Sequence, residues 1–100
     1  MKVNVQAVNF NIDKKLVNFI QEKLDKLEKY CDKVVSSDVF LKLENTSDKE
    51  NKTIEVKINV PGDEFMVKKT CKSFEEAVDI SVESLERVLV KYKEKMRTYV

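Results

Sequence analysis

Basic side chains near the end of the sequence have the clearest potential for chemistry, which is the binding of anions. Residues 75 to 86 include five acidic residues and no basic residue, whereas residues 87 to 97 include five basic residues and one acidic residue. Arg87, Lys91 and Lys95 recur every four residues, a spacing that places them on one side of a helix. Such a row can neutralise the phosphates of a nucleic acid and release their counterions. The full basic set is Arg87, Lys91, Lys93, Lys95 and Arg97.

The negative end of the helix dipole explains part of this basic set without any ligand. Cations are favourable near the C-terminus of every helix, but the effect fades within the last turn. It accounts for Lys95 and Arg97, whereas Arg87 lies about three turns from the end of the chain. We therefore expect Arg87 to serve a purpose other than stabilising the helix.

A second basic set lies in the first predicted helix and consists of Lys23, Lys26, Lys29 and Lys33. The four-residue spacing lets Glu22 pair with Lys26 and Asp25 with Lys29, at about 0.3 kcal/mol for each pair. Taken alone, this pattern is typical of an ordinary solvated helix surface. If the two helices lie side by side on one sheet, their outward surfaces merge into a broad basic plate suited to an RNA backbone.

Other kinds of chemistry have little support in the sequence. The chain has no histidine, a single glycine and two cysteines, Cys31 and Cys71, which are forty residues apart. We therefore predict no catalytic site, no phosphate-binding glycine loop, no metal site, no cofactor and no small-molecule substrate. Both cysteines fall at core-facing positions and are expected to be buried thiols. The adjacent Glu75 and Glu76 suit the first turn of a helix, where the dipole favours carboxylates.

The overall composition indicates one soluble domain over residues 1–100. Hydrophobic residues make up 42% and charged residues 37%, while the net charge is only +1. Global charge thus gives no argument for nucleic-acid binding, which must rest on where the charges lie. The sequence has no apolar run of about 18 residues and its first ten residues do not resemble a signal peptide, so we expect a cytoplasmic protein that contacts no membrane.

Apolar periodicity places the elements of the first half of the chain. Val3, Val5 and Ala7 alternate with polar residues, as in a half-buried strand. Asp13 can cap a helix that is expected to end near residues 30 to 32. Its core-facing stripe is Leu16, Ile20, Leu24, Leu27 and Cys31. A second strand follows, with Val39, Leu41 and Leu43 on one face, and the polar segment "ENTSDKENK" is then expected to be an exposed, mobile loop.

Two further strands and a long helix complete the chain. The third strand has Ile54, Val56, Ile58 and Val60 on its core face, and the fourth has Phe65, Val67 and Cys71. Residues 60 to 63, "VPGD", suit the tight turn between them. Ser73 and Glu76 form a capping box at the start of the last helix. The core-facing residues of this helix are Phe74, Val78, Ser81, Leu85, Leu89, Tyr92 and Met96.

The order of elements predicts an α/β (α+β) two-layer sandwich with β-α-β-β-β-α topology. A strand, helix and strand in succession favour a right-handed parallel crossover, and the remaining strands form a meander. Each helix has one apolar stripe, so both helices should cover the same face of a four-stranded sheet.

Several segments carry a resemblance to a known family. They are "KLEKYCDKV" (26–34), "FLKLEN" (40–45), "TIEVKINVPGDEFMVKKT" (53–70) and "SFEEAVDISVESLERVLVKYKEKMR" (73–97). The chain thereby resembles the ribosome hibernation promoting factor family, which includes ribosome-associated inhibitor A and was once called the sigma-54 modulation proteins. The resemblance implies a non-enzymatic translation inhibitor of the same fold. Such proteins bind the small ribosomal subunit in its head–body channel, where mRNA and the A- and P-site tRNAs would lie.

The family's RNA-binding positions carry over to basic residues on both helices. The matching residues are Lys23, Lys26, Lys29, Arg87, Lys91, Lys93, Lys95 and Arg97. Ser84 stands where several relatives have a lysine, and Glu75 and Cys31 replace aromatic residues, which puts individual contacts in question. The chain ends at Val100 and resembles a short form, so we expect a monomer when free that does not join two ribosomes unaided.

Two other kinds of binding protein compete with this hypothesis. The similar double-stranded-RNA-binding fold places a lysine cluster at the start of its last helix, where this chain has "SFEEAVD", so that mode is disfavoured. A protein–protein adaptor would use the open sheet face, and its charged helices would merely be solvated. An enzyme would require a carboxylate site that the sequence does not reveal. A ribosome-binding hibernation factor is the leading hypothesis.

Overall fold

Seven regular segments form the fold in the predicted β-α-β-β-β-α order. The computed structural model describes residues 1–8, 10–44 and 51–98, with side chains through Lys95. The segments are β1 (Lys2–Val8), α1 (Lys14–Asp25), the 3₁₀ helix η1 (Lys26–Lys29), β2 (Ser36–Leu43), β3 (Lys52–Val60), β4 (Asp63–Cys71) and α2 (Phe74–Thr98). The loop predicted at "ENTSDKENK" falls mostly on residues 45–50, which lie outside the described residues.

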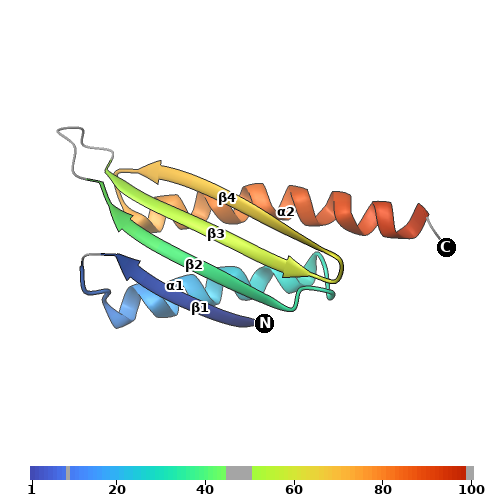
Figure 1. The fold of residues 1–100 in the computed structure, drawn as a ribbon, viewed down its shortest axis with the longest axis horizontal. Coiled ribbons are helices and arrows are strands. Elements are labelled where there is room, and N and C mark those ends of the chain that lie inside the picture. Colours follow the sequence, from blue (N-terminus) through green and yellow to red (C-terminus); the bar gives the residue numbers. More distant parts are fainter. Residues whose placement is uncertain (9, 45–50, 99–100) are drawn as a thin grey trace.

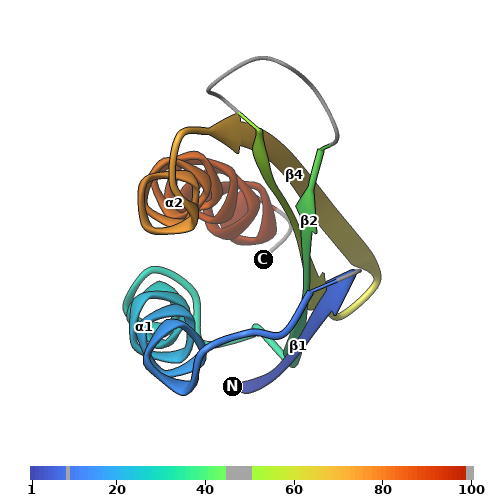
Figure 2. The ribbon, with the colours of Figure 1, turned by 90° about the vertical axis from the view of Figure 1, so that its left-hand side faces the viewer.

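The four strands form one mixed sheet in the order β1-β2-β3-β4. β1 pairs in parallel with β2, with Lys2 opposite Ser36, and the pairs β2–β3 and β3–β4 are antiparallel. Both helices lie on the same side of the sheet and leave its other side open (Figure 2). The predicted two-layer sandwich is therefore confirmed.

The topology makes the two helices run in the same direction. A parallel crossover places α1 antiparallel to both β1 and β2, and the meander brings β4 back parallel to β2. α2 then turns back along the sheet as α1 does, so the two helices end at the same end of the molecule (Figure 1). This arrangement brings together the C-terminal halves of two helices that are far apart in the sequence.

The hydrophobic core lies between the sheet and the helices. All four predicted residues of β3 are at most 6% exposed, and the predicted stripe of α1 and η1 is buried from Leu16 to Cys31. The predicted face of α2 is likewise buried from Phe74 to Tyr92, while the side chain of Met96 lies outside the described residues. Leu43 is 39% exposed, contrary to prediction, because the helices cover β2 nearer its start, where Ser37 is fully buried.

The Asp13 cap is present as predicted, whereas the predicted Ser73–Glu76 capping box shows only its serine bond among the described residues, and the end of the first helix differs. The Lys15 amide donates to Asp13 Oδ1 (3.0 Å), and the Glu76 amide donates to Ser73 Oγ (3.2 Å). α1 ends at Asp25, several residues earlier than expected, and continues as the tighter η1. The amides of Tyr30 and Cys31 both donate to the Leu27 carbonyl (3.0 and 3.2 Å). This tightening keeps the side chains of Leu27 and Cys31 in the core.

Contacts with the β3–β4 turn hold the second half of α2 against the sheet. The turn contains Gly62 at φ +79°, a conformation that glycine adopts without strain. The Tyr92 hydroxyl donates to the Pro61 carbonyl (3.0 Å), and the Tyr92 ring meets Phe65 edge-on with centroids 5.8 Å apart. The outward side chains of this half of α2 therefore project from a firmly anchored helix.

Candidate nucleic-acid interface

The second half of α2 carries exposed cations opposite its buried face. Leu85, Leu89 and Tyr92 pack into the core, which turns the intervening basic residues toward solvent. Those basic residues are Arg87, Lys91, Lys93 and Lys95, all exposed. Within the described part of the chain, none of the four forms an ion pair with a carboxylate. Arg97 belongs to α2, but its side chain lies outside the described residues.

Lys26 and Lys29 on η1 are also exposed and form no ion pair with a described carboxylate. The predicted Glu22–Lys26 and Asp25–Lys29 pairs are therefore wrong. The 3₁₀ geometry of Lys26–Lys29 alters the four-residue spacing on which the Asp25–Lys29 pair depends. Asp25 instead accepts from Gln21 Nε2 (2.9 Å).

Lys23 differs from the other predicted site residues because it bridges the two helices. Its Nζ lies 3.2 Å from Asp79 Oδ1 on α2 and 5.4 Å from the centre of the Phe19 ring. An ion pair of this exposed kind contributes at most about 1 kcal/mol, so a phosphate can compete with Asp79 for Lys23. Its charge is nevertheless less available than those of Lys26 and Lys29.

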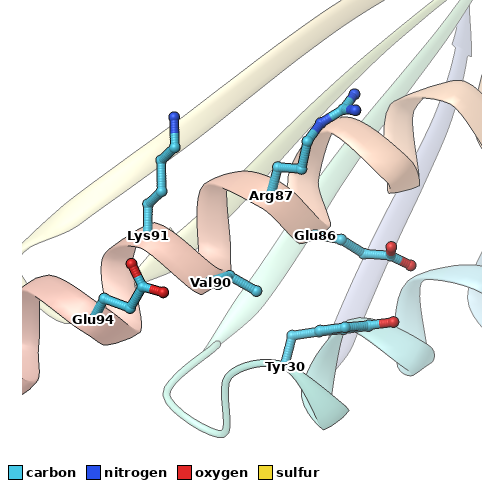
Figure 3. A pocket seen from close by; sticks show the side chains of 6 residues that line it. All are labelled: Tyr30, Glu86, Arg87, Val90, Lys91 and Glu94. Atoms are coloured by element: carbon cyan, nitrogen blue, oxygen red, sulfur yellow. The ribbon is translucent and has the colours of Figure 1, made fainter.

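Three adjoining hollows join these cations into one region. The largest, of about 450 Å³, is lined by Tyr30, Glu86, Arg87, Val90, Lys91 and Glu94 (Figure 3). A second, of about 240 Å³, shares Tyr30, Val90 and Glu94 with the first and adds Lys29 and Lys93. A third, of about 260 Å³, shares Lys91 and adds Lys95 beside Asp63 and Phe65 on β4. We call this region the basic surface and define it by Lys29, Arg87, Lys91, Lys93 and Lys95.

Two apolar side chains at the basic surface were not anticipated from the sequence. Tyr30 and Val90 are each 39% exposed and line the two hollows that lie between η1 and α2. The sequence does contain a signal for these two residues. Both lie outside the apolar stripes of their helices and are adjacent to basic residues. An aromatic or β-branched residue that lies outside the core-facing stripe, beside basic residues, has no evident packing role.

The open face of the sheet has a different electrostatic character. Lys57 Nζ lies 3.0 Å from Glu64 Oε2, and Lys68 Nζ lies 3.8 Å from Glu55 Oε1. Asn4 donates to Asp38 on the neighbouring strand (3.1 Å). Much of the charge on this face is thus matched within the sheet, whereas the cations of the basic surface have no described carboxylate partner. The basic surface is the better candidate for binding an external anion.

Cys31 and Cys71 are both buried, as predicted. Among the residues that the structure describes, no cluster of three cysteine or carboxylate side chains could hold a metal ion. No described helix is long and apolar enough to cross a membrane.

Comparisons with known proteins relate nearly the whole chain to one family. Residues 3–97 match the family described as sigma 54 modulation protein / S30EA ribosomal protein. The ribosome hibernation promoting factor of Escherichia coli K12 is 29% identical over 99 residues, which cover 99% of this chain and 100% of that protein. The factor of Azotobacter vinelandii is 28% identical over 95 residues, covering 95% of this chain and 85% of the relative. The Bacillus subtilis ribosome hibernation promotion factor is 29% identical, and the match spans 96% of this chain but half of that protein.

Solved structures show the same fold. A ribosomal subunit interface protein from Coxiella burnetii superposes with a TM-score of 0.82 at 19% identity, covering 94% of this chain and 99% of the other. The N-terminal domain of Protein Y from Thermus thermophilus superposes with a TM-score of 0.80 at 22% identity, covering 92% and 99%.

Proposed function

Because the chain belongs to the sigma 54 modulation protein / S30EA ribosomal protein family, we propose that it is a ribosome hibernation factor that inhibits translation. Its partner is the small ribosomal subunit, and its place there is the head–body channel through which mRNA and tRNAs pass. Several relatives that match almost the full chain are named ribosome hibernation promoting factors.

The basic surface is the observation that carries this proposal. Its five cations come from η1 and α2 and none forms an ion pair with a described carboxylate, although the net charge of the chain is only +1. Each cation that neutralises a phosphate of ribosomal RNA releases counterions, which supplies affinity without sequence readout. Lys23, Lys26 and Arg97 complete the set that we assign to ribosomal RNA.

The mechanism requires occupancy alone. A domain held in the channel by phosphate contacts excludes mRNA and tRNA as long as it stays bound, and no bond is made or broken. We therefore expect no enzymatic activity, no cofactor and no small-molecule substrate. Before it binds the ribosome, the protein is a monomer in the cytoplasm.

Co-sedimentation with purified small subunits tests the proposal. The variant Arg87→Glu/Lys91→Glu/Lys95→Glu should lose binding, because the basic surface becomes acidic, while circular dichroism should show the wild-type fold. The matched control is Lys2→Glu/Lys42→Glu/Lys72→Glu, which changes three exposed basic residues elsewhere on the molecule and should pellet like wild type.

Two outcomes would count against this assignment. If the Arg87 variant pellets as well as wild type, the basic surface is not the RNA contact. If wild type itself does not pellet, the ribosome assignment fails. The adaptor hypothesis then leads, and the exposed Phe40 and Met66 of the open sheet face become the residues to change.

A further inference from the structure

The groove between η1 and α2 contains apolar surface that phosphate binding does not use. Tyr30 and Val90 line both of its hollows, and each keeps 39% of its surface exposed among charged neighbours. Phosphate contacts need only the cations around this groove. We call the larger of these two hollows, of about 450 Å³, the Tyr30 groove.

We propose that the Tyr30 groove receives an unstacked base of a single-stranded RNA segment, with the Tyr30 ring as its stacking surface. The inference rests on the proposed function in that it takes RNA as the ligand. It adds a contact with a nucleobase to a surface otherwise assigned to phosphates. Every base has a π-face, so such stacking tolerates many sequences.

The distribution of charge in the groove favours a ligand with a neutral part and an anionic part. Figure 3 shows Glu86 and Val90 projecting toward Tyr30, whereas Arg87 and Lys91 rise from a different side of α2. A phosphate placed beside Tyr30 would meet the carboxylate of Glu86 and be repelled. A neutral base suits that position, and the phosphates linked to it can reach Arg87 and Lys91.

The Glu86 carboxylate also gives the groove a means of discriminating between bases. A carboxylate accepts hydrogen bonds from an exocyclic amino group, which adenine, cytosine and guanine possess and uracil lacks. The amino group of a bound base can donate to Glu86, whereas uracil has only its N3–H to donate. We therefore expect uracil to bind more weakly than the other three bases.

The backbone of η1 sets the position of the Tyr30 ring. The Tyr30 amide donates to the Leu27 carbonyl (3.0 Å), and Leu27 is fully buried in the core. The backbone that carries the ring is therefore held next to α2 instead of lying on a free loop. Bases within a duplex are already stacked, so a preformed aromatic surface selects single-stranded RNA.

A tryptophan reporter provides the first test, because the chain contains no native tryptophan. Tyr30→Trp keeps an aromatic ring in the groove and makes its fluorescence specific to that site. Titration with a single-stranded 12-nucleotide RNA should quench this fluorescence, and a blunt-ended RNA duplex with the same number of phosphates should quench it far less. The control variant is Met66→Trp. Met66 is 64% exposed on the open sheet face, so the fluorescence of a tryptophan at this position should change with neither RNA.

Affinity measurements on unlabelled variants provide the second test. Tyr30→Leu keeps an apolar side chain without a π-face and should bind the single strand about tenfold more weakly. Tyr30→Phe should bind as wild type does. The salt dependence should be the same in all three proteins, because the phosphate contacts are unchanged.

The results separate this inference from the proposed function. If wild type binds small subunits but Tyr30→Leu binds the single strand as tightly as wild type, or the blunt-ended duplex quenches Tyr30→Trp equally, base stacking is refuted and the phosphate surface stands. If the Arg87 triple variant loses affinity for the single strand and Tyr30→Leu does not, Tyr30 has no role in binding the RNA. If wild type binds neither small subunits nor the single strand, both proposals fail.

Discussion

Replacing Arg87 and Lys91 with glutamine should change how strongly binding to the small subunit depends on salt. The double variant Arg87→Gln/Lys91→Gln removes two cations of the basic surface that have no described carboxylate partner. Glutamine is a good helix former and introduces no opposite charge, so α2 should keep its structure. The variant therefore isolates the contribution of positive charge.

The expected magnitude follows from the number of phosphates that are contacted. The eight cations assigned to ribosomal RNA, at one phosphate each, give a slope of log affinity against log salt of about −7.2, so that affinity falls about 20,000-fold between 50 and 200 mM salt. With six contacts the slope is about −5.4 and the fall is about 1,800-fold over the same range. The slope of the double variant should therefore be about three quarters that of wild type.

Filter binding of labelled protein to small subunits, at constant magnesium and several potassium chloride concentrations, measures both slopes. The control is Lys2→Gln/Lys42→Gln, two exposed lysines of the sheet strands that should leave the slope unchanged. An Arg87/Lys91 variant with the wild-type slope would refute the assignment of phosphates to these residues, even if its affinity were lower. A changed slope in the control would mean that net charge, and not the basic surface, governs binding.

Three further predictions concern the scaffold. Leu27→Ala removes a fully buried side chain and should lower the free energy of unfolding in urea by about 2–5 kcal/mol; a loss below about 1 kcal/mol would contradict the packing of η1 into the core. Tyr92→Phe removes the hydroxyl that donates to Pro61, and calorimetry should show a loss of about 1 kcal/mol if this bond anchors α2. Lys23→Gln breaks the ion pair with Asp79 and should change the unfolding free energy by less than about 1 kcal/mol, whereas a larger loss would make Lys23 mainly structural.

Local patterns were sufficient to predict most of the fold. Alternating residues in β3, the capping residues Asp13 and Ser73 and the stripe of α2 from Phe74 to Tyr92 were confirmed, because each is a property of a few neighbouring residues. Predictions failed where a neighbouring layer decides the outcome. Leu43 has the right periodicity for the core face, but the helices do not cover it. The Asp25–Lys29 pair failed for a local reason instead, because its four-residue spacing assumes an α-helix and the chain forms η1 over Lys26–Lys29.

The candidate site shows the same division. The segregation of charge along α2 and the row of Arg87, Lys91 and Lys95 can be read from the sequence, since a helix fixes which residues share a side. The proximity of Tyr30 to Val90, sixty residues away, cannot be read in this way. It arises because strand pairing makes β4 parallel to β2, which turns α2 in the same direction as α1. Periodicity and capping specify the elements, whereas the packing of both helices on one sheet specifies which of their ends meet.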